Sequence, residues 1–192
     1  MKNVLIINGH PNANSYCHAL AEAYQKGSAS KGNHAAVLHV ADLNFNVNLS
    51  HGYTQRTELE PDLIMAQEKI QWANHIVIIH PVWWGSVPAL LKGFFDRTLL
   101  PGFAFKYKEN SPWWDKLLAG KTGHVIYTSD TPIWLYEYFF GAPSVNQVKK
   151  RVLQFCGITP VKVTGIAPIR NSTPEFRKKW LDKIEQIAAN TF

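Results

Sequence analysis

The sequence predicts a three-layer α/β domain with a parallel sheet, and three observations support this fold class. Short apolar runs rich in Val and Ile recur along the chain, as expected for strands that helices cover on both faces. Helical patterns alternate with these runs from end to end. The chain has 192 residues and shows neither an internal repeat nor a linker, so residues 1–192 are expected to form one domain.

Five segments are expected to be strands and five to be helices. The strands are 4–8, the more amphipathic 35–40, 75–82, 123–128 and 161–166. The helices are 15–27, 61–72, 88–100, 144–155 and 174–189, where Ser15 suits an N-cap and a proline opens three of the others. Segments 44–60 and 101–121 depart from the alternation and are expected to be long loops.

The composition narrows the class of protein. No apolar run approaches the ~18 residues that a membrane span needs, so no membrane insertion is expected. The formal net charge is +6, but the basic residues are scattered, so nucleic acid is not expected as a partner. The two cysteines, Cys17 and Cys156, form neither a disulfide framework nor a metal motif. We therefore expect no metal and place the protein in the cytoplasm.

A small and polar loop, Gly9-His10-Pro-Asn-Ala-Asn-Ser15, follows the first expected strand and precedes a helix. The start of a helix offers free N–H groups and the positive end of the dipole, and Ser15 adds a hydroxyl donor, so the loop is a candidate anion site. It has neither the P-loop pattern nor the Rossmann dinucleotide pattern. The alternatives are that Ser15 is only an N-cap and that His10 is only a surface residue.

Two adjacent tryptophans follow the third expected strand, in Trp83-Trp84-Gly85-Ser86-Val87-Pro88. Such a pair is hard to hide in a core, and a flat aromatic wall beside freed N–H groups suits a planar ligand such as an isoalloxazine ring. The alternative is a place in a dimer interface. After the fourth strand, Thr128-Ser-Asp-Thr131 offers hydroxyls and turn N–H groups for the polar edge of a ring, unless it is an ordinary turn. Ligands of parallel α/β sheets bind at the carboxyl ends of the strands, so the three loops together predict a flavin site.

These residues resemble the flavodoxin-like NAD(P)H:quinone oxidoreductases, the group of DT-diaphorase and its short bacterial relatives. The resemblance covers nearly the whole chain. It rests on Gly-His-Pro and Ser15-Tyr16 after the first strand, and on segments 41–45, 62–73, 80–94, 102–107 and 155–157. It implies a flavodoxin-like sandwich with a five-stranded parallel sheet in the order 2-1-3-4-5.

The resemblance also implies a chemistry and an assembly. The family members are homodimers with a flavin in each of two sites, where NAD(P)H reduces the flavin and leaves before a quinone takes the electrons. FMN is favoured over FAD, because short relatives often carry FMN. By this resemblance, the phosphate side of the flavin would be held by His10, Ser15 and Tyr16. The ring would be packed by Pro81, Val82, Trp83, Trp84 and Gly85, and its pyrimidine edge would be met by Thr128, Ser129, Asp130 and Thr131.

The chain departs from this family in the turn after the fourth strand and in the segment that follows. Thr128-Ser-Asp-Thr131 stands where the family often has Thr-Thr-Gly-Gly, so the pyrimidine contacts are expected to differ. A carboxylate would oppose the negative charge of a reduced ring, so we expect Asp130 to point away, where it can cap its own turn. Tyr136 falls near a tyrosine that assists charge transfer and is the candidate catalytic residue. Ala142 takes the place of the accompanying histidine.

Two other functions remain open. Some short relatives attach to potassium-efflux transporters, so a flavin-binding regulatory subunit of such a transporter is the alternative to an enzyme. A flavodoxin-type electron carrier would want an acidic surface, which this basic chain lacks. The aromatic run 133–140 suits a buried helix, a substrate wall or part of a dimer surface. Cys17 begins a helix, where the pKa of a thiol can fall, but we expect no reactive role for it.

Overall fold

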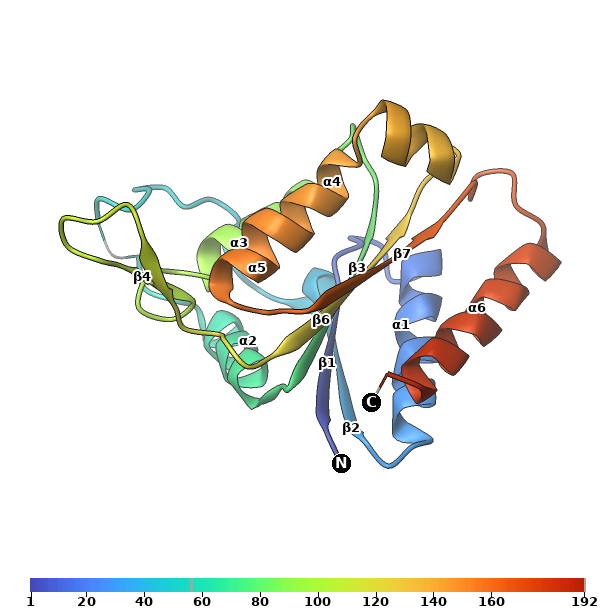
Figure 1. Cartoon of the computed structure of the whole chain (residues 1–192), viewed down its shortest axis with the longest axis horizontal. Coiled ribbons are helices and arrows are strands. Elements are labelled where there is room, and N and C mark those ends of the chain that lie inside the picture. The colour runs from blue at the N-terminus through green and yellow to red at the C-terminus, as the bar shows by residue number, and fades with distance from the viewer. Residues whose placement is uncertain (56, 192) are drawn as a thin grey trace.

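Five parallel strands form the central sheet of the computed structural model, which describes residues 1–55 and 57–191 (Figure 1). Their order across the sheet is β2-β1-β3-β6-β7. The strands are β1 (Asn3–Asn8), β2 (His34–His39), β3 (His75–Pro81), β6 (Thr122–Thr128) and β7 (Val161–Ile166). The predicted order 2-1-3-4-5 is confirmed, because the two strands that lie between β3 and β6 in the sequence belong to a separate hairpin.

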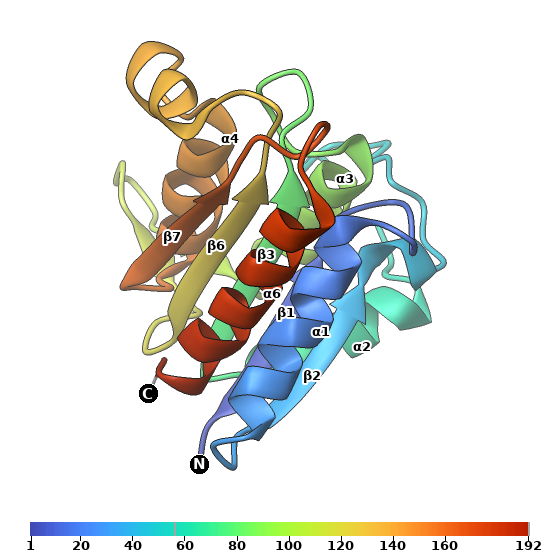
Figure 2. The same ribbon diagram turned by 90° about the vertical axis from the view of Figure 1, so that its right-hand side faces the viewer.

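Helices cover both faces of the sheet (Figure 2). On one face lie α1 (Tyr16–Ala29) and α6 (Pro174–Ala189), and on the other lie α2 (Pro61–Trp72), α3 (Ala89–Thr98) and a helical segment made of α4 (Pro143–Asn146), η3 (Gln147–Leu153) and α5 (Gln154–Cys156). Val4 and Ile6 of β1 join the core under α1 and α6, whereas Leu5 and Ile7 join the opposite core. Successive side chains of a strand point to opposite faces, so a continuous apolar run fills both cores. None of the described helices is both long and apolar enough to cross a membrane.

Two elements lie outside the pattern that the sequence predicts. The expected loop 101–121 contains an antiparallel hairpin of β4 (Phe105–Tyr107) and β5 (Trp114–Lys116). The aromatic run after β6 forms η2, a π-helical turn over Leu135–Phe139. This turn is not the buried helix that was one reading of the run, because Trp134, Tyr138 and Phe139 are 65%, 87% and 77% exposed.

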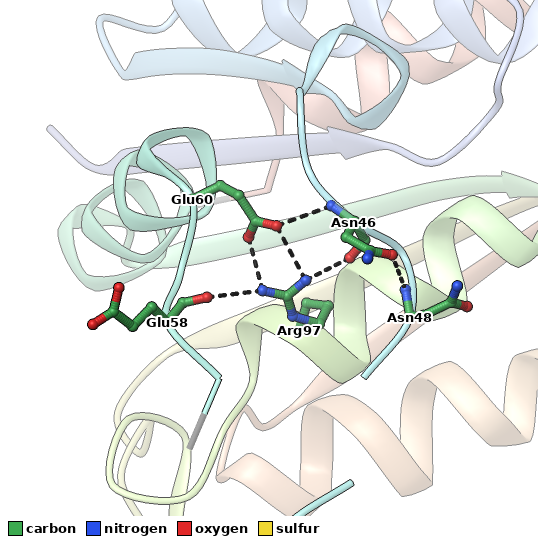
Figure 3. Close-up of polar contacts among 5 residues, drawn as sticks. All are labelled: Asn46, Asn48, Glu58, Glu60 and Arg97. Carbon is green, nitrogen blue, oxygen red and sulfur yellow. Dashed lines mark hydrogen bonds and ion pairs between the residues drawn. The ribbon is translucent and has the colours of Figure 1, made fainter. Parts of the chain in front are cut away.

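The irregular segment before α2 is held to α3 by a buried arginine, Arg97 (Figure 3). The side chain of Arg97 is 2% exposed, and its Nη2 lies 2.8 Å from a carboxylate oxygen of Glu60. The guanidinium also donates to the carbonyls of Asn46 at 2.6 Å and Glu58 at 3.0 Å. The Asn46 N–H in turn donates to Glu60 at 3.0 Å. One buried cation therefore holds Asn46, Glu58 and Glu60, which lie near the two ends of this polar segment, against α3.

Candidate functional site

Three loops meet at the edge of the sheet where β1, β3 and β6 end (Figure 2). The ring centroids of His10 and Trp83 are 5.5 Å apart and the rings lie at 75°, so the first loop contacts the third. Cys17 Sγ lies 3.6 Å from Thr128 Oγ1, so the first turn of α1 contacts the end of β6. The Val82 N–H donates to the Thr128 carbonyl at 2.8 Å, which joins the ends of β3 and β6. The structure thus brings the three sequence-predicted loops into one site.

The first loop is shaped by side chains that accept a hydrogen bond from the backbone N–H two residues further on. Asn8 Oδ1 accepts from the His10 N–H at 3.1 Å, and His10 Nδ1 accepts from the Asn12 N–H at 3.0 Å. Asn12 Oδ1 accepts from the Asn14 N–H at 2.8 Å. Such side-chain acceptors replace the pairing that a strand or helix would give the backbone. The loop is therefore built outward from Asn8, the last residue of β1.

Ser15 is the N-cap of α1, where its Oγ accepts from the His18 N–H at 3.3 Å. The prediction that Ser15 is an N-cap is thus confirmed. Because Oγ accepts in this bond, the hydroxyl can still donate its hydrogen to a ligand. The N–H groups of Tyr16 and Cys17, in the first turn, have no acceptor within the helix. These three donors surround the positive end of the helix dipole, an arrangement that suits an anion.

His10 can add a fourth donor to this set. Its Nδ1 accepts a backbone N–H, which can only donate, so the neutral ring carries its proton on Nε2. Burial lowers the pKa of His10, so the ring is mostly neutral at pH 7.

Two other side chains near the start of α1 are already engaged. The Tyr16 hydroxyl donates to the Arg177 carbonyl at 2.8 Å, so Tyr16 offers the site its backbone N–H rather than its hydroxyl. Burial raises the pKa of the Cys17 thiol to about 12, although the hydrogen bond to Thr128 opposes this. Cys17 is 1% exposed, so the first turn of α1 does not present this thiol to solvent.

The two tryptophans occupy a tight turn after β3 and have different surroundings. Two hydrogen bonds close the turn. The Trp83 N–H donates to the Ser86 carbonyl at 3.0 Å, and the Ser86 N–H donates to the Trp83 carbonyl at 2.8 Å. Trp83 is 44% exposed, whereas Trp84 is fully exposed and has a left-handed φ of 51°. The N–H groups of Trp84 and Gly85 take part in neither bond. Two aromatic faces and two N–H groups therefore lie beside the buried Pro81 and half-buried Val82.

The turn after β6 uses part of its own donor set internally. The Ser129 N–H donates to the Ile166 carbonyl at 3.0 Å, and the Thr131 N–H donates to Ser129 Oγ at 3.0 Å. Asp130 does not cap this turn; its Oδ1 accepts from the Arg170 N–H at 2.7 Å and its Oδ2 lies 3.5 Å from Arg170 Nε. The carboxylate is thus held by the loop between β7 and α6. The hydroxyls of Ser129 and Thr131 and the Asp130 N–H remain as donors.

Tyr136 lies in a small core beside Tyr127 and Val145 and is 3% exposed. Its hydroxyl lies 2.6 Å from Ser144 Oγ and accepts from the Ser144 N–H at 3.0 Å. The hydroxyl is thus engaged at the start of α4. Ala142, just before α4, has a left-handed φ of 46° and places no imidazole there.

The residues at this edge fit a flavin phosphate ester. The first loop and α1 supply donors for an anion, the tryptophan turn supplies an aromatic surface, and the β6 turn supplies hydroxyls for a polar ring edge. No group of His, Cys, Asp or Glu side chains among residues 1–55 and 57–191 has the arrangement of a metal site. Sequence reasoning missed two features of this edge, namely the role of Asn8 in shaping the loop and the Arg170 bond to Asp130. The Asp130 contact joins residues 40 positions apart, whereas Asn8 bonds to the N–H of His10 only two positions on, so an Asn at the end of a strand was the available signal.

Known proteins resemble this chain along nearly its whole length. Residues 2–188 match the family described as having a flavodoxin-like fold. An uncharacterised NAD(P)H oxidoreductase of Haemophilus influenzae is 29% identical over 189 residues, which cover 96% of this chain and 93% of the relative. NAD(P)H dehydrogenase [quinone] 1 of Rattus norvegicus is 24% identical, with 97% and 78% covered. The crystal structure of Smu.1420 from Streptococcus mutans is 30% identical, with 97% and 98% covered and a TM-score of 0.82.

Proposed function

The chain belongs to the flavodoxin-like fold family, and from this premise we propose that it is a flavin-dependent NAD(P)H oxidoreductase that reduces quinones or similar acceptors. The observation that carries the proposal is the mutual contact of the three loops at the ends of β1, β3 and β6. A single ligand with an anionic end and a flat end would use all three. The relatives named as NAD(P)H oxidoreductase and as NAD(P)H dehydrogenase [quinone] support the same chemistry.

We assign the phosphate of FMN to the first loop, because this loop and the start of α1 offer several donors to one compact anion. The Ser15 hydroxyl, the His10 Nε2–H and the N–H groups of Tyr16 and Cys17 would hold it. The ring would lie on Pro81, Val82, Trp83, Trp84 and Gly85, with its pyrimidine edge toward the Thr128–Thr131 turn. A neutral His10 donates without adding a charge, so the helix dipole and the hydroxyl supply most of the attraction.

A bound flavin would supply the redox chemistry, taking two electrons from NAD(P)H and passing them to the acceptor. The chain supplies position and electrostatics. The Asp130 N–H and the hydroxyls of Ser129 and Thr131 would stabilise negative charge at the pyrimidine edge. The Asp130 carboxylate is bound to Arg170, which keeps its charge from opposing this. Trp83 and Trp84 give a flat and open surface on which NAD(P)H and the acceptor can bind in turn, as ping-pong transfer requires.

We further propose a homodimer whose interface includes the aromatic turn η2. Tyr138, Phe139 and Phe140 are 87%, 77% and 56% exposed, and a contiguous apolar patch of this kind marks an interaction surface. The turn is connected to the site, because the N–H of Tyr136 in η2 donates at 3.0 Å to the carbonyl of Pro132, which directly follows the Thr128–Thr131 turn. A second copy on this face would also cover the ring site. We place the protein in the cytoplasm, where NAD(P)H is available and the thiols Cys17 and Cys156 stay unpaired.

The visible spectrum of the purified protein tests the function directly. We expect a yellow protein that releases FMN on heating, as identified by mass spectrometry. NADPH or NADH should bleach the flavin, and a quinone should restore its colour. Product inhibition should also fit a single site used in turn. The oxidised nucleotide should compete with the quinone, and the hydroquinone should compete with NAD(P)H. A colourless protein that takes up no flavin and oxidises no nucleotide would overturn the proposal.

A further inference from the structure

A hydrogen-bonded pair, Asn8 and His39, lies beneath the first loop of the site. The two are register partners at the ends of β1 and β2. Asn8 is 1% exposed and His39 is half-buried. Both side chains lie on the face of the sheet that α1 covers, directly under the first turn of that helix. The pair therefore connects the edge strand β2 to the loop that we assign to the flavin phosphate.

The hydrogen bonds fix the direction of the Asn8 amide and the tautomer of His39. Asn8 Oδ1 must face the loop, because the His10 N–H, 3.1 Å away, can only donate. Asn8 Nδ2 therefore faces His39 Nδ1 at 3.1 Å. The amide nitrogen is a donor and no acceptor, so His39 Nδ1 has to be unprotonated. The neutral ring of His39 carries its proton on Nε2.

The charged and titratable neighbours of His39 come from α1 and from η1 (Val40–Asp42). The His39 ring stacks on that of His18, with centroids 4.1 Å apart and planes 6° apart. His18 Nε2 lies 3.5 Å from Glu22 Oε1. Burial and then His18 lower the pKa of His39, while Asp42 and Glu22 raise it. His39 is therefore neutral at pH 7 and gains its proton in the acid range.

We propose that Asn8 and His39 are positioning residues for the flavin phosphate loop, and that a proton on His39 Nδ1 releases this loop. The inference rests on the proposed function. With Nδ1 protonated, Asn8 and His39 would present two donors to each other. The Asn8 amide then has to turn, so that its oxygen faces His39 and its NH2 faces the His10 N–H.

The turned amide removes the first hydrogen bond of the loop. His10 then loses the acceptor for its N–H, and the bonds built on it, from Asn12 to His10 and from Asn14 to Asn12, lose their starting point. The added positive charge on His39 would by itself strengthen phosphate binding. The part of an acid-induced loss of flavin affinity that depends on His39 therefore reports the hydrogen-bond effect of its proton and not the charge effect.

The dissociation constant of FMN across a range of pH tests the inference. It is measured by the fluorescence released on dilution of the flavin-loaded protein at about pH 8 and at steps down to about pH 4.5, which reaches well below the ordinary histidine pKa because that of His39 is lowered. We expect the wild-type constant to rise about tenfold at the lowest pH, which corresponds to the loss of one buried hydrogen bond. In His39→Asn, the amide oxygen takes the place of Nδ1 and accepts from Asn8 at every pH. This variant should lose most of the pH dependence.

Matched controls separate the pair from other titrating groups. His34→Asn changes an exposed histidine at the other end of β2 and should keep the wild-type pH dependence. The phosphate of FMN titrates equally in all variants, and riboflavin, which has no phosphate, should show a smaller change with pH. A His39→Asn protein with the full wild-type pH dependence would overturn the inference. Circular dichroism at each pH shows that the fold persists.

Nuclear magnetic resonance of the wild-type protein gives a readout that needs no variant. The His39 ring should carry its proton on Nε2 at about pH 8, and the His10 amide resonance should move with the titration of His39. A proton on Nδ1, or a His10 amide that ignores the titration, would contradict the inference. Absence of FMN binding at about pH 8 would instead contradict the proposed function, since the pair is then in its loop-holding state.

Discussion

Arg97 and Glu60 form an ion pair in which the cation is buried and the anion is partly exposed, with side-chain exposures of 2% and 30%. The pair joins α3 to the residue before α2, where Glu60 also accepts a hydrogen bond from the N–H of Asn46 (Figure 3). Gly93, one helical turn before Arg97, lies so close to Val47 that a Cβ there would be 2.8 Å from the Val47 Cβ. Loop and helix therefore fit each other at two adjacent points.

Arg97→Met should lower the free energy of unfolding by about 3 kcal/mol, because it leaves the Glu60 carboxylate and two backbone carbonyls without their donor. Urea unfolding measures this loss. Lys92→Met is the matched control, since Lys92 belongs to an exposed pair with Asp96 on the same helix and should cost less than about 0.5 kcal/mol. Equal losses in the two variants would show that burial of the Arg97 pair has no energetic consequence.

Stability should fall as the pH drops below the ordinary histidine range. Burial, with the charge of Lys162, lowers the pKa of His75 to about 4, and burial, His75 and Lys162 lower that of His124 to about 3. A depressed pKa means that the folded protein stays neutral while the unfolded chain takes up protons. This stabilisation is fully present above about pH 6.5 and is lost progressively as the pH falls to about 4 for His75 and to about 3 for His124.

The variant His124→Gln isolates one part of this acid sensitivity. A glutamine amide can keep the bond that His124 Nε2 makes to Thr164 Oγ1 at 2.9 Å, but it does not titrate. The free energy of unfolding, measured with urea between about pH 8 and about pH 4.5, should decline less steeply with falling pH than in the wild type. His51→Gln, at an exposed histidine, should leave the slope as it is. An unchanged slope in His124→Gln would mean that His124 contributes nothing to acid unfolding.

The fold could be predicted from the sequence because its signals are local. Each of the three central strands has six or seven residues and contains an apolar run, and the helices between them have their own start signals. The β4–β5 hairpin has strands of three residues, too short for a periodic pattern. Arg97 reads as an exposed residue of an amphipathic helix, and its partner lies 37 positions earlier in the chain. Prediction of the Asn8–His39 bond likewise requires the register between the two strands.

Trp84→Ala should weaken FMN binding about tenfold, because a stacked aromatic face is worth about 1–3 kcal/mol. The side chain of Trp84 is fully exposed and its φ is 51°, so the backbone holds the ring out from the turn rather than in the core. Removal of the ring should therefore leave the free energy of unfolding of the flavin-free protein unchanged. Flavin fluorescence titration measures the affinity. Trp72→Ala, at a 40% exposed tryptophan at the end of α2, is the control that should bind FMN as the wild type does.

Phe139→Lys should shift the protein from dimer to monomer, because it places a charge in the aromatic patch that we assign to the interface. Analytical ultracentrifugation over a range of protein concentrations gives the dissociation constant of the dimer. Tyr53→Lys changes a similarly exposed aromatic residue outside η2 and should remain a dimer. A monomeric wild type, or a Phe139→Lys protein as dimeric as the wild type, would contradict the assigned interface.

Tyr136→Phe tests whether the candidate catalytic tyrosine acts on the reaction or on the structure. The change removes the acceptor of the buried Ser144 N–H and the partner of Ser144 Oγ, which should lower the free energy of unfolding by about 1–3 kcal/mol. Because the hydroxyl is enclosed at the start of α4, we expect kcat with NADPH and a quinone to change less than twofold. Ser144→Ala should lower stability to a similar extent and serves as the matched control. A large fall in kcat in Tyr136→Phe alone, at unchanged FMN affinity, would show that the hydroxyl reaches the flavin during turnover, after η2 has moved.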